Sequence, residues 1–292
     1  MTKEVEQEKR RILVTLTPSE SKRLIAKGVK NLEVVQRALK HGTVVVGLGT
    51  TNAFVAEEIL SGLGEEAKIE IEIEKQRYAA GVVTARGTCI VAKAERERDL
   101  IIKKGRVSEI SKGDRGEEIK NAVEELSAGD VFIKGANALD ASGTAGVLLA
   151  HPTGGTIGSA LGTVLARGVN FVIPVGIEKT IPFPVAEAAK RVGIERFYKS
   201  AASGGGSGVP VGLMPVHGKV VTEVEALKIL GAEDAFPFAA GGVDGGEGSV
   251  VLCAESSEEN AEKLEALAAL VAEIKGEPPV KLEGVAVDCG LQ

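Results

Sequence analysis

The chain has 292 residues, of which 44% are hydrophobic and 26% are charged, and its formal net charge at pH 7 is −6. This composition is that of a globular protein, and no apolar run approaches the roughly 18 residues that a membrane-spanning helix needs. Seven phenylalanines, two tyrosines and no tryptophan, with a negative net charge, provide neither a stacking platform nor a basic surface. We therefore expect no nucleic-acid partner and no membrane partner. The charged N-terminal residues lead into no secretory apolar segment, which predicts a cytoplasmic protein.

The N-terminal part of the chain is predicted to begin a parallel α/β arrangement. Residues 17–20 form a capping box with proline at the first helical position, and apolar residues at helical spacing continue as far as Leu39. A β-branched strand at 43–46 follows, then a glycine turn and a helix over 53–61. A strand, a turn and a helix in this order are typical of half a parallel α/β unit.

Residues 68–110 differ from this pattern and are predicted to form short alternating strands that elaborate the main sheet. The parallel pattern then resumes with a helix at 115–126, a strand at 131–133, a helix at 156–167 and a strand at 170–175. A strand, a helix and a strand in this order favour a right-handed parallel crossover.

A glycine-rich segment at 203–208 is predicted to be a hinge between two structural units. Residues 1–202 form the predicted α/β domain, whose sheet is mostly parallel and is flanked by helices. Residues 209–282 form a smaller predicted α+β module, with two helices on a small sheet. Residues 283–292 are a candidate strand that returns to the main sheet.

The cysteines and histidines indicate no metal site. Cys89, Cys253 and Cys289 are odd in number and far apart, which favours reduced thiols over a disulfide framework. The three histidines are also scattered, and no cluster of cysteines or carboxylates accompanies them. We therefore expect neither a bound metal nor a cofactor.

A candidate anion-binding turn lies at the end of the predicted strand at 43–46. Gly47 and Gly49 are followed directly by Thr50 and Thr51 at the start of a helix. Such a turn offers free amides, two hydroxyls and the positive end of a helix dipole, a combination that favours a small anion. The spacing is not that of the dinucleotide-binding fingerprint. The alternative is a tight turn that needs glycine for its geometry alone.

A second turn of the same kind precedes the helix at 156–167. Thr153, Gly154, Gly155 and Thr156 place backbone amides where they can face the same crevice as the first turn. We interpret His151, which stands beside a proline, as a structural hydrogen-bonding residue rather than a catalytic one.

Polar residues follow the predicted strand at 131–133. Lys134, Asn137 and Asp140 lie in the turn that begins where this strand ends, and ligands of open α/β sheets bind at the carboxyl ends of strands. A lysine in a partly desolvated site can bind an anion or lose its proton and act as a base. Lys134 and Asp140 are therefore our candidate catalytic residues, and Asn137 would orient a hydroxyl or carbonyl of the ligand. The alternative is that Asn137 and Asp140 only stabilise the turn.

These segments resemble those of known sugar-phosphate enzymes. Residues 130–140 are similar to the strand and loop that ribose-5-phosphate isomerases end with Asp-Gly-Ala-Asp-Glu, and residues 47–51 to their phosphate loop. Residues 132–175 resemble methylthioribose-1-phosphate isomerases, and residues 172–182 resemble lactate-utilisation proteins. With glucosamine-phosphate deaminases and coenzyme A transferases, these families form one superfamily. The resemblance covers about residues 20–200 and implies a Rossmann-like domain and a homo-oligomer.

The same comparison leaves two functional hypotheses open. Lys134 and Asn137 stand where the isomerases carry acidic residues, and an amide cannot accept the proton. One hypothesis is an isomerase-like or transferase-like enzyme that binds a small phosphorylated or acyl-type anionic metabolite. The other is a ligand-sensing or assembly subunit that keeps the pocket without catalysis.

Overall fold

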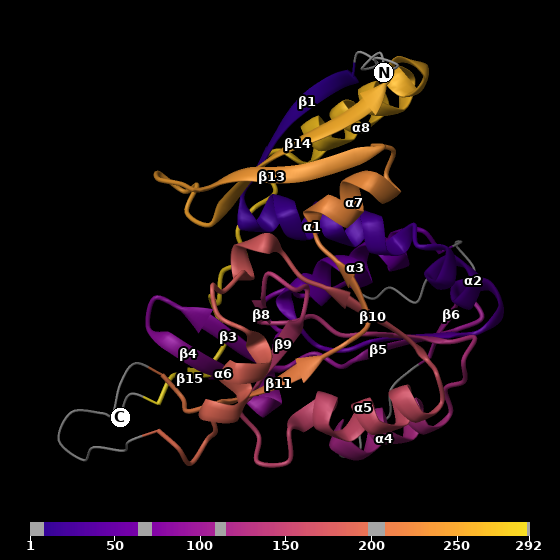
Figure 1. Ribbon diagram of the computed structural model, residues 1–292. Helices are drawn as coiled ribbons and strands as arrows, with labels where there is room; N and C mark the ends of the chain where they lie inside the picture. Colours follow the sequence, from indigo (N-terminus) through magenta and orange to yellow (C-terminus); the bar gives the residue numbers. More distant parts are fainter. Residues whose placement is uncertain (1–8, 64–71, 109–114, 198–207, 291–292) are drawn as a thin grey trace, which may run out of the picture.

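The computed structural model of the protein describes residues 9–63, 72–108, 115–197 and 208–290 (Figure 1). Residues 68–71 of the stretch predicted as strands and residues 203–207 of the predicted hinge lie outside these ranges. In the described part of the chain, no helix is both long enough and apolar enough to cross a membrane.

The largest sheet has six strands and mixes parallel and antiparallel neighbours. Its order is β12 (Lys219–Val221), β10 (Asn170–Pro174), β7 (Val131–Ile133), β2 (Thr43–Val46), β5 (Leu100–Lys103) and β6 (Arg106–Ser108). The first four strands are parallel to their neighbours, whereas β5 and β6 form an antiparallel hairpin beside β2. The predicted α/β class is confirmed. The sheet is nevertheless mixed, because β5 pairs with β2 in antiparallel orientation and β6 pairs with β5 as a hairpin.

Eight α-helices lie in the described ranges. They are α1 (Pro18–Lys30), α2 (Glu33–His41), α3 (Thr50–Ser61), α4 (Arg115–Glu124), α5 (Gly155–Ala166), α6 (Val185–Arg191), α7 (Glu223–Ile229) and α8 (Ala261–Ile274), with short 3-10 turns η2 (Lys93–Glu95), η3 (Ile177–Lys179) and η4 (Glu258–Asn260). The predicted capping box at the start of α1 is confirmed, because the Thr17 and Glu20 side chains each accept a hydrogen bond from the other residue's backbone amide.

Helices cover both faces of the main sheet. Val44 and Val46 of β2 pack in a core with residues of α1 and α3, whereas Val45 packs in a second core with residues of α4 and α5. This alternation follows from the two-residue period of a strand. Figure 1 shows α4 and α5 on the side of the molecule opposite α1 and α3. A sheet buried on both faces leaves the strand ends as the places where a polar site can form.

A second, antiparallel sheet joins the two ends of the chain. Its strands are β1 (Lys9–Leu16), β14 (Ser249–Ser257) and β13 (Asp234–Gly241), in that order. Helix α8 packs on this sheet through Leu264 and Leu267, which belong to the same core as Val14 of β1. The N-terminal strand β1 therefore forms one sheet with β13 and β14 from the C-terminal part of the chain. Strand β12, which also comes from the C-terminal part, lies in the main sheet.

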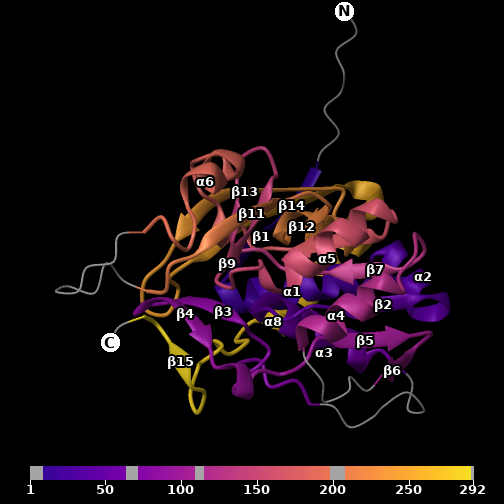
Figure 2. The same ribbon diagram turned by 90° about the horizontal axis from the view of Figure 1, so that it is seen from below.

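Two small sheets form the remaining wall of the molecule. One contains β3 (Gly81–Thr84), β4 (Gly87–Val91) and β15 (Val287–Asp288), and the other contains β8 (Ala138–Leu139), β9 (Ala145–Leu149) and β11 (Gly212–Val216). Figure 2 shows β15 near β4 at the lower edge of that view, and β15 pairs with β4 in antiparallel orientation. The candidate return strand at 283–292 therefore pairs with β4 and not with the main sheet.

Cys89 and Cys289 form a disulfide, so the expectation of three reduced thiols is wrong for these two residues. Val287 lies opposite Val91 and Asp288 opposite Ile90, and the same register brings Cys289 opposite Cys89. The two cysteines are 200 residues apart in the sequence. Only the strand pairing brings them together, and Cys253 remains a free thiol.

Candidate functional site

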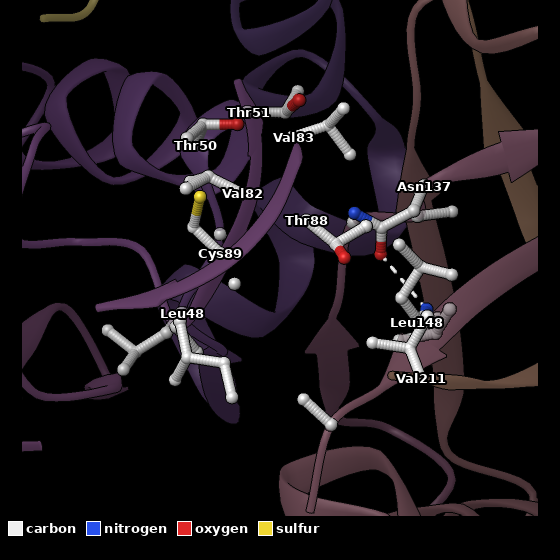
Figure 3. Close-up of a pocket in the computed structure, with 18 of the residues that line it drawn as sticks. Leu48, Thr50, Thr51, Val82, Val83, Thr88, Cys89, Asn137, Leu148 and Val211 are labelled. Carbon is white, nitrogen blue, oxygen red and sulfur yellow. Dashed lines mark hydrogen bonds between the residues drawn. The ribbon is translucent and has the colours of Figure 1, made fainter. Parts of the chain in front are cut away.

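A cavity of about 590 Å³ lies at the carboxyl ends of three parallel strands. Its lining includes the residues that follow β2, β7 and β10, together with the first turns of α1, α3 and α5. Of the residues predicted for the site, the structure places these on the cavity wall: Gly49, Thr50, Thr51, Lys134, Asn137, Gly154, Gly155 and Thr156. Figure 3 shows the two threonines on one side of the cavity and Asn137 across from them. Sheet ends are the usual place for a ligand in an open α/β fold.

Helix α3 points its N-terminus at this cavity. The amide of Gly47 donates to the Ile133 carbonyl (2.9 Å), and that of Gly49 donates to the Tyr78 carbonyl (2.8 Å). These two glycine amides are therefore not available to a ligand, contrary to the expectation for the glycine turn. No side chain caps α3, so the amides of its first turn, beginning at Thr50 and Thr51, are the donors that remain.

Helix α5 presents a second uncapped N-terminus to the same cavity. Gly154 and Gly155 both have positive φ, 81° and 58°, a conformation that side chains with a Cβ rarely adopt. A Cβ on Gly158 would also collide with the Thr153 carbonyl, so the tight start of this helix needs glycine there. Thr153 itself lies outside the cavity lining, and its hydroxyl is 2.9 Å from His151 Nδ1. His151 is thus held by a local turn contact, which agrees with a structural interpretation.

Lys134 reaches across the end of the sheet from β7 to the turn after β2. Its Nζ donates to the Leu48 carbonyl at 3.0 Å, directly before the start of α3. Burial lowers the pKa of Lys134 to about 8, the Asp99 carboxylate opposes this shift, and repulsion from Lys179 adds to it. Asp99 is held by the amide of Leu48 at 2.7 Å. The ammonium of Lys134 is therefore easier to deprotonate than that of a surface lysine. A negative charge brought close to it would stabilise its protonated form.

Two further lysines line the cavity, and the sequence patterns did not single them out. Lys179, in η3, places its Nζ 3.3 Å from Thr51 Oγ1. Lys22, in the second turn of α1, donates to the Pro18 carbonyl at 2.9 Å and is mostly buried. Burial also lowers the pKa of Lys22. Only the packing of α1 and η3 against the strand ends reveals their place, because each looks like an ordinary surface lysine in the sequence.

Two glutamates lie beside these lysines. Glu178 lines the cavity and is 3.7 Å from Lys22 Nζ, while Glu223 is fully buried behind it at the start of α7. Burial, together with the nearby Glu178 charge, raises the pKa of Glu223 to about 7. A Cβ at position 176 would overlap the Glu178 carboxylate, so a side chain there would displace this carboxylate. Glu178 is the one carboxylate on the described cavity wall, against the cationic residues Lys22, Arg96, Lys134 and Lys179.

Asn137 lies on the cavity wall as predicted, whereas Asp140 does not. Asn137 lines the cavity, but its side-chain oxygen accepts from the Leu148 amide (3.1 Å), as the dashed line in Figure 3 shows. Only its amide NH₂ group can serve a ligand. Asp140 lies outside the cavity lining, and its carboxylate accepts hydrogen bonds from the amides of Ser142, Thr144 and Val185. A hydrogen bond from the Ser142 hydroxyl, together with these amide bonds, holds the pKa of Asp140 below the ordinary value. Asp140 therefore stabilises the turn and is not placed to act as a base in this cavity.

Comparison with protein-family models, with curated proteins and with solved structures finds no match for this chain. In the described part of the chain, no group of three or more histidine, cysteine or carboxylate side chains is arranged to hold a metal ion. The geometry and charge of the cavity are therefore the features that indicate a function.

Proposed function

We propose that the protein binds a small organic anion, of phosphorylated or acyl type, in the cationic corner of the cavity. This corner consists of Thr50 and Thr51 at the start of α3 together with Lys22, Lys134 and Lys179. The observation that carries the proposal is that an uncapped helix N-terminus meets partly buried lysines, one of which is 3.3 Å from the Thr51 hydroxyl. Free amides, hydroxyls and ammonium groups are the donors that bind phosphate and carboxylate.

The charge of the corner supports the same proposal. Three ammonium groups lie near two carboxylates, Glu178 on the cavity wall and Asp99 beside Lys134, and the carboxyl of Glu223 is only about half ionised at pH 7 because its pKa is raised to about 7. Burying positive charge is unfavourable, and the pKa values of Lys134 and Lys22 are lowered by burial even though the Asp99 and Glu178 carboxylates oppose the shift. A bound anion offsets the cost, so the site is complementary to a ligand with negative charge.

Lys134 is the residue that favours turnover in addition to binding. Its pKa of about 8 leaves a fraction of about one tenth unprotonated at pH 7, and a neutral amine beside an anion site can accept a proton from the ligand. An isomerase-like or transferase-like reaction would use this group, and Asn137 would hold a ligand oxygen through its NH₂. Kinship with the Rossmann-like ribose-phosphate isomerase and coenzyme A transferase superfamily, and a homo-oligomeric state, belong to the same proposal.

The experiment is a thermal-shift and calorimetric panel of inorganic phosphate, sugar phosphates, nucleotides, acyl-coenzyme A esters and short carboxylates. It uses the wild type, Lys134→Ala and Lys179→Ala, with Lys190→Ala as a matched control, because Lys190 is exposed on α6 beside Glu187. A ligand at about a hundred times its dissociation constant stabilises a protein by roughly 2.7 kcal/mol, which corresponds to several degrees in Tm.

We expect one ligand class to raise the Tm of the wild type and of Lys190→Ala, and to lose most of this effect in the other two variants. Absence of a shift with every anion would contradict the proposal, and so would an equal shift in all four proteins. Turnover is tested separately with the ligand so found, by following its conversion in the wild type and in Lys134→Ala.

A further inference from the structure

The wall of the cavity beyond the cationic corner is aliphatic. Its apolar side chains come from β3, β4, β9, the segment around β11 and the C-terminal segment, and they are Val82, Val83, Ile90, Val147, Leu148, Leu149, Val209, Val211, Val280 and Leu282. All of them except Val147 keep part of their surface exposed. Figure 3 shows Val82 and Val83 beside the two threonines, and Leu148 and Val211 on the opposite side. Five separate segments therefore contribute apolar side chains to one wall.

The hydroxyls of Thr84 and Thr88 in this wall are already bonded within the protein, and of Asn137 only the NH₂ group remains as a donor. The hydroxyl of Thr88 donates to the Val209 carbonyl at 2.7 Å, and that of Thr84 is 3.4 Å from the Gly87 carbonyl. The oxygen of Asn137 accepts from the Leu148 amide. A sugar ring placed here would lose water from its hydroxyls and gain few protein partners, and an unsatisfied polar group is unfavourable in such a site. An aliphatic chain needs no such partners and gains from burial.

From these two features we infer that the ligand is an amphiphile: an anionic head, phosphate monoester or carboxylate, that carries an aliphatic chain. The head lies in the cationic corner and the chain lies against the aliphatic wall. This inference depends on the proposed anion site and selects the ligand class for it, an alkyl or acyl anion over a sugar phosphate. A volume of about 590 Å³ is within the usual range for a site that takes such a molecule.

The test is a chain-length series measured by calorimetry below micelle-forming concentrations. One series contains methyl, butyl and octyl phosphate, and the other contains acetate, butanoate and octanoate. Ribose 5-phosphate is the polar comparison, because it carries a sugar in place of an aliphatic chain on the same phosphate group. We expect affinity to increase about threefold to fourfold per methylene, so that butyl phosphate binds roughly fiftyfold more tightly than methyl phosphate. Ribose 5-phosphate should bind no more tightly than methyl phosphate. The series with the higher affinity identifies the head group.

Substitutions in the cavity wall test where the aliphatic chain of the ligand lies. Val83 is 69% exposed, so the double substitution Val83→Thr and Val211→Thr tests the wall with little risk to the fold. It should reduce the gain per methylene and leave the affinity for methyl phosphate unchanged. Val243→Thr is the matched control, because Val243 is 82% exposed and lies outside the cavity lining. Lys134→Ala should weaken every member of the series by a similar factor and leave the gain per methylene intact.

The outcomes separate this inference from the function on which it depends. If methyl phosphate binds through Lys134 but longer aliphatic chains do not increase the affinity, the inference of an amphiphilic ligand is wrong and the proposed anion site is retained. If no anion of any length binds, both are wrong. A gain with chain length that persists in the threonine double variant overturns the placement of the chain, and ribose 5-phosphate binding more tightly than butyl phosphate overturns the ligand class.

Discussion

The buried carboxyl of Glu223 makes the stability of this protein depend on pH in a direction that can be measured. The pKa of Glu223 is raised from the ordinary 4.5 to about 7, first by burial and then by the neighbouring Glu178 charge. Between these two values the unfolded chain has lost the proton while the folded protein keeps it, so folding takes up a proton. Below about pH 4.5 Glu223 therefore does not lower the free energy of unfolding. As the pH rises toward 7, the free energy of unfolding decreases.

The magnitude follows from the same two pKa values. A difference of about 2.5 units at roughly 1.36 kcal/mol each is a loss of about 3 kcal/mol of unfolding free energy. Glu223→Gln removes this titration. Its amide oxygen can still accept the hydrogen bond that the Ile177 amide now donates at 2.9 Å. Its NH₂ group would occupy the place of Glu223 Oε1, a buried oxygen with no hydrogen-bond partner in the described part of the protein.

The assay is urea unfolding of the wild type and Glu223→Gln at pH 5 and pH 8. We expect the difference in stability between variant and wild type to shift by about 2.5 kcal/mol in favour of the variant between these two pH values, because part of the titration of the unfolded chain already lies below pH 5. Glu187→Gln is the control, because Glu187 forms a surface ion pair with Lys190 and its replacement should change little. The reasoning is refuted if wild type and Glu223→Gln show the same pH dependence.

Two further predictions concern the cavity and its wall. Because the pKa of Lys134 is about 8, the affinity for a phosphate monoester should fall by up to about tenfold per pH unit above 8. Calorimetry at increasing pH should show no such decrease for Lys134→Ala, and an equal decrease in both proteins would assign the effect to another group. Cys289→Ser opens the disulfide to Cys89, which lines the cavity, and should lower the unfolding free energy by about 2–4 kcal/mol and weaken ligand binding. Urea unfolding and the same ligand titration measure both effects; unchanged stability together with full affinity would show that the cross-link does not support the wall.

Local features of the sequence determined most of the secondary structure around the site. The capping box at residues 17–20 marks the start of α1, and the alternation of β-branched runs with glycine turns located β2, β7, α5 and β10 to within one or two residues. These signals can be read from the sequence because capping, turn formation and hydrophobic periodicity act over a few neighbouring residues. They also indicated Thr50, Thr51 and Lys134, which lie at the ends of such strands.

Only the tertiary structure decided what surrounds these residues. Lys22 enters the cavity because α1 packs against strand ends far from it in the sequence, and Glu178 and Lys179, which follow β10, meet residues that follow the distant strands β2 and β7. In the same way β1 pairs with β14 from the other end of the chain, and register alone places Cys289 against Cys89. The hydrogen bonds that occupy the glycine amides and Asp140 are likewise decided by the packed environment. Contacts between distant segments depend on strand register and on the packing of whole elements, which local sequence signals do not encode.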